Sequence, residues 1–273
     1  MSTDSMLLND RAAAYGDGLF ETIAIRDGEP RFWPLHVARL QSGCLLLGIP
    51  CPSDEALRAD LGSAIDGSTI SVEYATAKLV VSAGNGPRGY RRDPAADAIV
   101  RVGIFPAAVL ATTQYREGVA TRLCATRLAA QPQLAGIKSL NRLEQVLARS
   151  EWSEPDIFEG LMLDTDKRLI CGTMSNVFIA TQSSLATPAI TRCGVSGIMR
   201  RHVLRLLQDA GIDCVVRDIQ VDELASADEV FLTNSQFGIL PLRQCADLQW
   251  NVGAITQQAQ KLLAANGVPE CAA

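Results

Sequence analysis

The chain has few of the residues on which metal and acid–base chemistry most often depends. Only two of its 273 residues are histidines, His36 and His202, which argues against a histidine-rich metal site or a serine–histidine hydrolase. Its eight cysteines include no C-x-x-C pair, so neither a zinc site nor a dithiol redox motif is indicated. Scattered cysteines without a disulfide framework favour a reducing cytoplasm.

The chain also lacks a strong charge of either sign and a long apolar run. A net charge of −5 with no basic stripe gives no indication of nucleic-acid binding. The apolar stretch of residues 98–110 is interrupted by Arg101 and Pro106, and residues 1–5 carry no basic segment before an apolar one. We therefore expect neither a membrane span nor a signal peptide, and a cytoplasmic protein.

What is present describes a globular protein of mixed class. Hydrophobic residues make up 48% of the chain and charged residues 20%, enough to bury a sizeable core. Short helical patterns and strands of mixed length occur in both halves, which predicts an α/β (α+β) fold. We expect an N-terminal α/β domain over residues 1–106, an Ala- and Thr-rich linker over 107–117, and a C-terminal domain over 118–273.

Local signals give the expected elements. Residues 19–25 and 30–32 form a strand pair about a turn, and a helix over 36–47 stops at Gly48 before Pro50. Ser53 caps a second helix over 54–65. Further strands are expected at 77–82, 99–105, 120–124, 158–163, 169–170, 176–180 and 230–233, and further helices at 197–210 and 253–265.

The segment from Gly136 to Arg149 carries the most suggestive lysine. Asn141 and Glu144, three residues apart, predict a capping box, and Leu143, Val146 and Leu147 predict an inward apolar helix face. Lys138 would then project from a loop fixed by the helix behind it. A desolvated lysine so placed can lose its proton and act as a Schiff-base nucleophile, whereas an ordinary lysine there is simply solvated.

Two other segments have the composition of an anion cradle. Gly194–Arg200 is a Gly-bracketed turn at a helix start, where free N–H groups and the helix dipole favour phosphate. Leu232–Ser235 is a strand end with hydroxyl and amide side chains. Arg39, on the helix of residues 36–47, is a third candidate. Taken alone, each is better explained by a purely structural role, namely a capped helix, a polar strand end and a surface ion pair.

Taken in order, these segments resemble one family, the fold-type IV pyridoxal-phosphate enzymes, which include branched-chain and D-amino-acid aminotransferases. The run Lys138–Leu147 is most similar to the aminodeoxychorismate lyase branch of that family. The other matching segments are residues 15–22, 36–40, 89–90, 134–149, 172–176 and 194–200. The resemblance implies a two-domain fold, with a small N-terminal α/β domain and a larger C-terminal pseudo-barrel domain.

The resemblance also implies a set of site residues. Lys138 would bind pyridoxal 5′-phosphate as a Schiff base, and Arg39 would hold its phosphate. The remaining cofactor contacts would come from Cys171, Ile198, Met199, Asn234 and Ser235. Weaker candidates for substrate contact are Tyr15, Arg88 and Arg91. The expected reaction converts 4-amino-4-deoxychorismate to 4-aminobenzoate and pyruvate for folate synthesis, in a homodimer that uses no metal, nucleic acid or membrane.

Two positions depart from the family pattern. Cys171 stands where relatives usually carry the Glu that keeps the cofactor's pyridine nitrogen protonated, and Ala83 stands where lyase relatives often carry Arg. A thiol is the poorer partner for that nitrogen. Two alternatives therefore remain open, a branched-chain or D-amino-acid aminotransferase of the same fold and a non-catalytic homologue.

Overall fold

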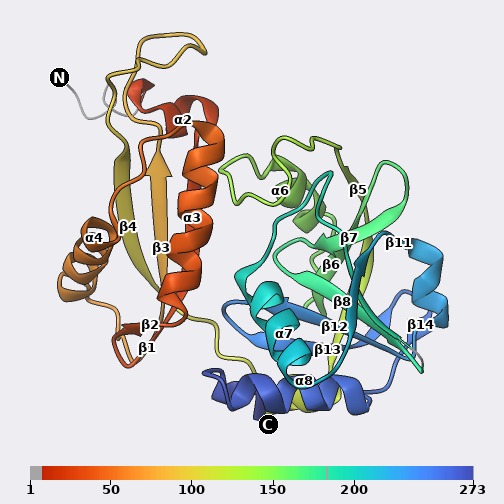
Figure 1. Cartoon of the computed structure of the whole chain (residues 1–273). Coiled ribbons are helices and arrows are strands. Elements are labelled where there is room, and N and C mark those ends of the chain that lie inside the picture. Colours follow the sequence, from red (N-terminus) through yellow and green to blue (C-terminus); the bar gives the residue numbers. More distant parts are fainter. Residues whose placement is uncertain (1–7, 183, 273) are drawn as a thin grey trace. The chain divides into compact units, whose positions relative to one another are not determined.

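The computed structural model describes residues 8–182 and 184–272, which form two compact units. The first unit comprises the chain up to Ala108 together with the segment Ile137–Arg142, and the second comprises Val109–Gly136 and the chain from Leu143 onward. The segment that carries Lys138 thus belongs to the first unit, although it follows the start of the second in sequence. Figure 1 shows the elements of both units, coloured by their position in the sequence from the N-terminus to the C-terminus.

The first unit is an antiparallel four-stranded sheet with helices. The strand order is β2-β1-β3-β4, and β1 pairs with β3 from Gly18 opposite Ser82 to Arg26 opposite Tyr74. Helix α3 packs on β1 and helix α4 on β4, as Figure 1 shows. The elements are α2 (Arg11–Tyr15), β1 (Gly18–Arg26), β2 (Glu29–Pro30), α3 (Trp33–Leu47), α4 (Asp54–Asp66), β3 (Tyr74–Ser82) and β4 (Ile99–Pro106).

Local chemistry explains the ends of these helices. Gly48 adopts a left-handed φ of 62° and ends α3, and the Ser53 side chain accepts a hydrogen bond from the Ala56 N–H at 3.1 Å and begins α4. Helix α3 begins at Trp33, three residues before the predicted start, because Pro34 has a fixed φ that suits the first turn of a helix.

The second unit is built on one curved sheet. Among its described residues, the ten strands run in the order β10-β9-β8-β12-β13-β5-β6-β7-β11, with β14 beside β13. Strand β7 also packs against β8 and β9, which brings the two halves of the sheet together as a pseudo-barrel. The strands are β5 (Val119–Leu128), β6 (Ile157–Asp164), β7 (Arg168–Gly172), β8 (Asn176–Thr181), β9 (Ser184–Pro188), β10 (Cys214–Arg217), β11 (Ile219–Gln220), β12 (Glu229–Asn234), β13 (Gly238–Cys245) and β14 (Leu248–Gln249).

Helices flank this sheet. They are α5 (Thr112–Glu117), α6 (Leu143–Arg149), α7 (Ile198–Asp209), α8 (Ala254–Ala264) and the 3₁₀ turns η1 (Val221–Ser226) and η2 (Pro269–Ala272). Helices α7 and α8 pack on each other, and both contact β12. The predicted fold class, a small α/β part and a larger pseudo-barrel part, is confirmed.

The predicted capping box at Asn141 and Glu144 is wrong. The Asn141 amide donates to the Gly16 carbonyl at 3.0 Å, and Glu144 accepts from the Ala129 N–H at 2.8 Å. Each side chain bonds instead to a backbone group that is distant in the sequence, so neither caps the helix. The helix begins only at Leu143.

The apolar face predicted for this helix is also wrong. Leu143, Val146 and Leu147 are 77%, 56% and 61% exposed, and Ala148 is the buried residue instead. Helix α6 has only seven residues, so the short spacing pattern does not decide which side meets the core.

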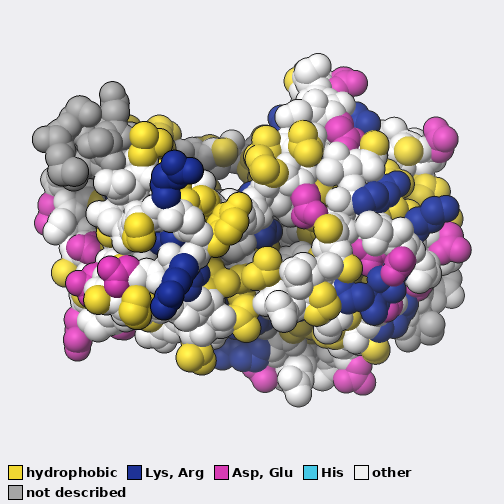
Figure 2. Space-filling model, turned by 90° about the horizontal axis from the view of Figure 1, so that it is seen from above, with side chains coloured by type: hydrophobic (Ala, Val, Ile, Leu, Met, Phe, Trp, Pro, Cys, Tyr) yellow, Lys and Arg dark blue, Asp and Glu magenta, His cyan; other side chains and the backbone are white. Residues whose placement is uncertain are grey.

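The surface is mixed in charge. Lys and Arg side chains are interspersed with Asp and Glu over the face shown in Figure 2. Within the described part of the chain, no helix combines the length and the apolar character that crossing a bilayer requires.

Candidate active site

Lys138 is fixed to the edge of the sheet in the first unit. The Phe20 N–H donates to the Lys138 carbonyl at 3.0 Å, and the Leu140 N–H donates to the Gly18 carbonyl at 3.0 Å. These two hydrogen bonds pair residues 138–140 with strand β1, so the backbone of Lys138 is held like that of a neighbouring strand. Its ammonium nitrogen lies 4.2 Å from the centroid of the Phe20 ring. Lys138 therefore lies in a loop, as predicted, but a strand rather than a helix positions it.

Gly18 makes this arrangement possible. A Cβ at Gly18 would lie 2.4 Å from the Val81 carbonyl oxygen and 2.9 Å from the Leu140 side chain. Only glycine therefore lets the segment of Lys138 approach β1 from one side while β3 pairs from the other.

Three buried charged or polar residues stand near this lysine in the first unit. Glu21 lies on β1, and His36 and Arg39 lie on α3; they are 2%, 1% and 8% exposed. The Arg39 guanidinium donates from Nε to Glu21 Oε1 at 2.8 Å and from Nη2 to Oε2 at 2.5 Å, a two-pronged ion pair. His36 Nδ1 lies 2.6 Å from Glu21 Oε2. Glu21 thus holds both side chains of α3.

The electrostatics of this group follow from burial and charge. Burial alone would raise the pKa of Glu21, but Arg39 and His36 overcome it and lower that pKa to about 2. Burial lowers the pKa of His36, and Glu21 only partly opposes this change. Glu21 is therefore ionised, and its carboxylate holds the positively charged guanidinium of Arg39 near Lys138.

The amine of Lys138 is strongly perturbed. Burial of the ammonium, followed by repulsion from Arg39, lowers the pKa of Lys138 from its ordinary 10.5 to about 8, although Glu21 opposes the change. At pH 7 about a tenth of this amine is uncharged, far more than for an ordinary lysine, and the uncharged form is the one that attacks a carbonyl. The sequence-based hypothesis of a desolvated, nucleophilic lysine is consistent with this environment.

In the second unit, the start of α7 is arranged as the sequence suggested. Gly197 is the residue before the helix, and as a glycine it has no side chain with which to cap it. Asn176 orders the approach, because its Oδ1 accepts from the Gly197 N–H at 3.1 Å and its Nδ2 donates to the Val195 carbonyl at 2.9 Å. Ile198 and Met199 form the first turn and are each 1% exposed, so their side chains are core and only their backbone could meet an anion.

The strand end at β12 lies against the same unit's turn after β7. The Asn234 amide donates to the Met174 carbonyl, and Asn234 Oδ1 accepts from the Gln236 N–H at 2.8 Å. Ser235 is half-buried beside it. The neighbouring Thr233, 1% exposed, has a buried hydroxyl with no hydrogen-bond partner among the described residues. An orphaned buried hydroxyl at this strand end is a group that an added ligand could satisfy.

Cys171 is buried near the end of β7. It is 5% exposed and belongs to an apolar cluster with Met162 and Ile170. The carboxylate that the family pattern expects at this position is therefore absent, and a thiol in an apolar setting stands in its place.

The contacts of the three candidates for substrate binding do not single them out as site residues. Tyr15 accepts a hydrogen bond from the Gly89 N–H at 2.9 Å, and its ring lies 5.5 Å from that of Tyr90. Arg88 and Arg91 are exposed on the loop that follows β3. The structure gives these two arginines no distinguishing partner.

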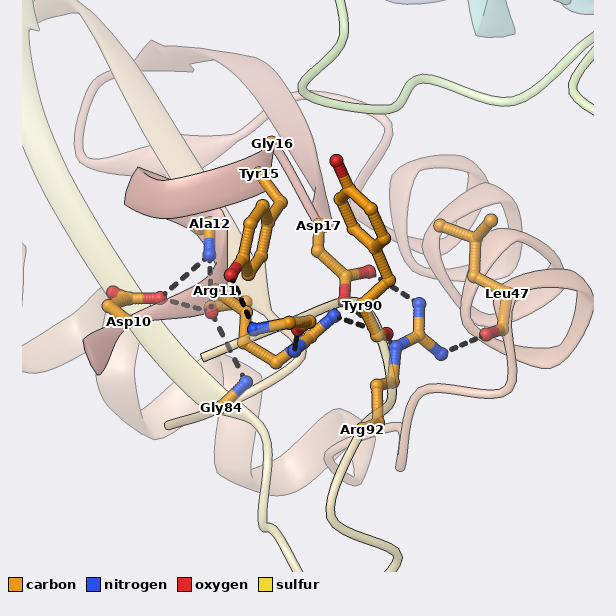
Figure 3. A network of polar contacts seen from close by, with 12 residues as sticks. Asp10, Arg11, Ala12, Tyr15, Gly16, Asp17, Leu47, Gly84, Tyr90 and Arg92 are labelled. Atoms are coloured by element: carbon orange, nitrogen blue, oxygen red, sulfur yellow. Dashed lines mark hydrogen bonds and ion pairs between the residues drawn. The ribbon is translucent and has the colours of Figure 1, made fainter. Parts of the chain in front are cut away.

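Other arginines hold that loop. Arg11 and Arg92 both donate to the carboxylate of Asp17, with Nε-to-Oδ2 distances of 2.8 and 2.9 Å, and Arg11 also donates to the carbonyls of Gly89 and Tyr90 (Figure 3). Burial would raise the pKa of Asp17, but Arg92 and Arg11 lower it overall. Arg92 is thus engaged in holding the loop.

Sequence reasoning missed Glu21 and His36. Their one detectable signal is a charged residue within the otherwise apolar strand pattern of residues 19–25, which calls for a buried partner. Nothing in the sequence identifies that partner as Arg39, eighteen positions later.

Comparison with known proteins agrees with this architecture. The model of the amino-transferase class IV family matches residues 18–245, so the chain belongs to that family. An aminodeoxychorismate lyase of Vibrio harveyi is 35% identical over 259 residues, 93% of each chain. A crystal structure of 4-amino-4-deoxychorismate lyase from Pseudomonas aeruginosa is 43% identical and superposes with a TM-score of 0.87 over 97% of this chain and 95% of that one. A D-alanine aminotransferase of Bacillus licheniformis is 29% identical over 86% of this chain and 81% of its own length.

Proposed function

We propose that this protein binds pyridoxal 5′-phosphate. The observation that carries the proposal is Lys138, an amine whose pKa is lowered to about 8 and which is anchored to β1. Within the first unit Arg39, held by Glu21, would supply a positive charge for the phosphate. In the second unit, taken by itself, the backbone N–H groups at the start of α7 and the orphaned hydroxyl of Thr233 are also groups suited to a phosphate oxygen. The residues present therefore fit the group.

We propose that the reaction is the lyase reaction, in which 4-amino-4-deoxychorismate gives 4-aminobenzoate and pyruvate. The similarity to two lyases, including one at 43% identity, supports this choice over other activities in the family. The bound cofactor would draw electrons away from the amine-bearing carbon of the substrate. Lys138 Nζ would take the proton from that carbon, because its lowered pKa lets it act as a base near neutral pH. Loss of the enolpyruvyl ether then leaves an aromatic ring.

An aminotransferase activity is the principal alternative, because the D-alanine aminotransferase of B. licheniformis is also similar. Cys171 argues against it. Transamination must stabilise and then reprotonate a carbanion through a protonated pyridine ring, whereas the elimination gains its driving force from the aromatic product. A buried thiol among apolar side chains is a poor partner for the protonated ring nitrogen. A ring nitrogen without its proton should impair transamination more than it impairs the elimination.

The same protein is proposed to act as a homodimer in the cytoplasm. The exposed apolar side chains of Leu143, Val146 and Leu147 on α6 are a surface that association could cover. None of the eight cysteines, all of which lie in the described part of the chain, forms a disulfide, which agrees with a reducing compartment.

The test uses the purified protein incubated with pyridoxal 5′-phosphate and reduced with borohydride. We expect one covalent adduct, on the Lys138 peptide, and release of pyruvate from aminodeoxychorismate that Lys138→Ala abolishes. Mapping of the adduct to Lys78 or Lys167 would contradict the cofactor assignment. An adduct on Lys138 together with amino-acid transamination and no pyruvate release would contradict the lyase assignment alone.

A further inference from the structure

A buried carboxylate in the second unit has no part in the chemistry described so far. Glu159, on β6, is 0% exposed. Its Oε1 accepts from the N–H groups of Gly160 at 2.9 Å and Thr173 at 3.1 Å, and from the Thr173 hydroxyl at 2.5 Å. Its Oε2 accepts from the Met174 N–H at 3.1 Å and the Ser175 hydroxyl at 2.8 Å. Five neutral donors converge on this carboxylate, and four of them belong to residues 173–175.

These contacts fix the turn between β7 and β8, which consists of Gly172–Ser175. The Gly172 N–H donates to the Ser175 carbonyl at 2.8 Å and closes the turn. A Cβ at Gly172 would lie 2.6 Å from Glu159 Oε2 and 2.3 Å from the Ser175 hydroxyl, so glycine is needed for the carboxylate to sit against the turn. The turn is therefore built around Glu159 rather than around its own backbone bonds alone.

The turn has two connections to the segments suited to an anion. Met174 accepts the amide hydrogen of Asn234 at the end of β12. Asn176, the residue directly after the turn, bonds to both Val195 and Gly197 at the start of α7. A Cβ at Gly197 would lie 2.1 Å from Asn176 Oδ1, so this approach is close. Asn176 also pairs with Thr233 of β12 in the sheet, so the strand end and the helix start both meet the residue that directly follows the turn held by Glu159.

We propose that Glu159 is the positioning residue of the phosphate cradle, acting through the turn Gly172–Ser175 on Asn176 and Asn234. This inference rests on the proposed cofactor, whose phosphate the cradle would bind. Glu159 itself would not touch the ligand. Its role is to hold the end of β12 and the start of α7 in a fixed arrangement. The hydrogen bonds named for each of these two segments run to the turn or to Asn176, and none joins one segment to the other.

The variant Glu159→Gln tests this role with little change in volume. An amide keeps one acceptor and turns the other into a donor. The Ser175 hydroxyl can rotate to accept, but a backbone N–H cannot, so the amide leaves at least one N–H of the turn facing another N–H. Groups that orient a binding site, measured best at metal sites, contribute about 10- to 100-fold in affinity. We expect a loss of that order for the phosphate.

The readout compares two probes, pyridoxal 5′-phosphate and pyridoxal, which lacks the phosphate. Each is titrated into apo protein, and attachment is followed by near-visible absorbance and by borohydride reduction. The wild type should prefer the phosphorylated probe. Glu159→Gln should lose about tenfold or more of that preference while pyridoxal attachment to Lys138 stays within about twofold. A merely structural loss would weaken both probes together.

Glu229 supplies the matched control. It is 9% exposed in the same unit and accepts from the N–H groups of Ile255 and Thr256 and from the Thr256 hydroxyl at the start of α8. Glu229→Gln should lower thermal stability and leave the preference between the two probes unchanged. Ser175→Ala, which removes one donor from Glu159, should reduce the preference by a few-fold and decides the matter if Glu159→Gln does not fold.

The outcomes separate this inference from the proposed function. An unchanged preference in Glu159→Gln, with an adduct on Lys138, would overturn the role of Glu159 and leave the cofactor assignment standing. An equal loss in Glu229→Gln would also overturn it, because the effect would then reflect general destabilisation. A wild type that attaches neither probe would overturn the cofactor assignment and, with it, the need for a phosphate cradle.

Discussion

The environment of Lys138 predicts that the lysine destabilises the apo protein at neutral pH. The drop in the pKa of Lys138 from 10.5 to about 8 corresponds to about 3 kcal/mol against the charged amine. Replacing it by Met keeps an unbranched apolar stem in contact with Phe20 and removes the buried charge. The contact of the ammonium with the Phe20 ring is lost, which costs about 0.5–1 kcal/mol. Lys138→Met should therefore gain about 2 kcal/mol in unfolding free energy at pH 7.

The pH dependence of this gain is the sharper part of the prediction. Below pH 8 the lysine is protonated in both the folded and the unfolded states, so the full cost is present. Between pH 8 and 10.5 the folded protein loses this proton while the unfolded chain keeps it, so wild-type stability rises relative to the variant. The transfer contribution to the gain should fall to about half near pH 9 and nearly vanish by about pH 10.5.

The assay is urea unfolding of both apo proteins at pH 7, 8, 9 and 10. Lys78→Met, at an exposed lysine on β3, is the control and should change stability by less than about 0.5 kcal/mol. A gain for Lys138→Met that does not decline with pH would show that it arises from packing. A loss of stability at pH 7 would refute the reasoning, because the lysine would then be well solvated or well paired.

Two further variants follow from the same contacts. Glu21→Ala removes the two-pronged ion pair from the buried guanidinium of Arg39 and should cost about 3–5 kcal/mol at pH 7. Because the pKa of Glu21 is lowered from 4.5 to about 2, this contribution is complete above pH 4.5 and is lost as the pH falls toward 2; urea titrations that show the same difference at pH 7 and pH 2.5 would contradict it. Cys171→Glu should raise transamination of amino acids, measured as keto-acid formation, by more than it raises pyruvate release, and it should lower the melting temperature because a carboxylate enters an apolar cluster. Strong wild-type transamination without pyruvate release would refute this assignment of Cys171.

The sequence by itself determined the elements whose signals are local. Helix α4 follows Ser53 and α3 stops at Gly48, both as predicted, and strands β6 and β7 lie where strands were expected. Each depends on a side chain or a backbone conformation within a few residues of the boundary, so a short window of sequence contains the whole cause. The sequence also identified the fold class and the lysine at residue 138 through a resemblance that covers most of the chain.

Tertiary structure decided where the neighbours of these residues come from. The sequence pattern gave Asn141 a partner three residues away, but the folded chain offers it the Gly16 carbonyl, and the capping interaction is lost. Helix α6 likewise exposes Leu143 because a seven-residue helix is oriented by what it meets in space, not by its own periodicity.

The chemistry of Lys138 is also a tertiary property. Its lowered pKa arises first from burial and then from the charge of Arg39, a residue ninety-nine positions earlier in the chain. Desolvation and Coulomb interactions depend on distance through space, and sequence separation does not set that distance. The sequence therefore pointed to the lysine, and only the return of Ile137–Arg142 to the edge of β1, beside the buried Glu21–Arg39 pair, lowered the pKa of its amine to about 8.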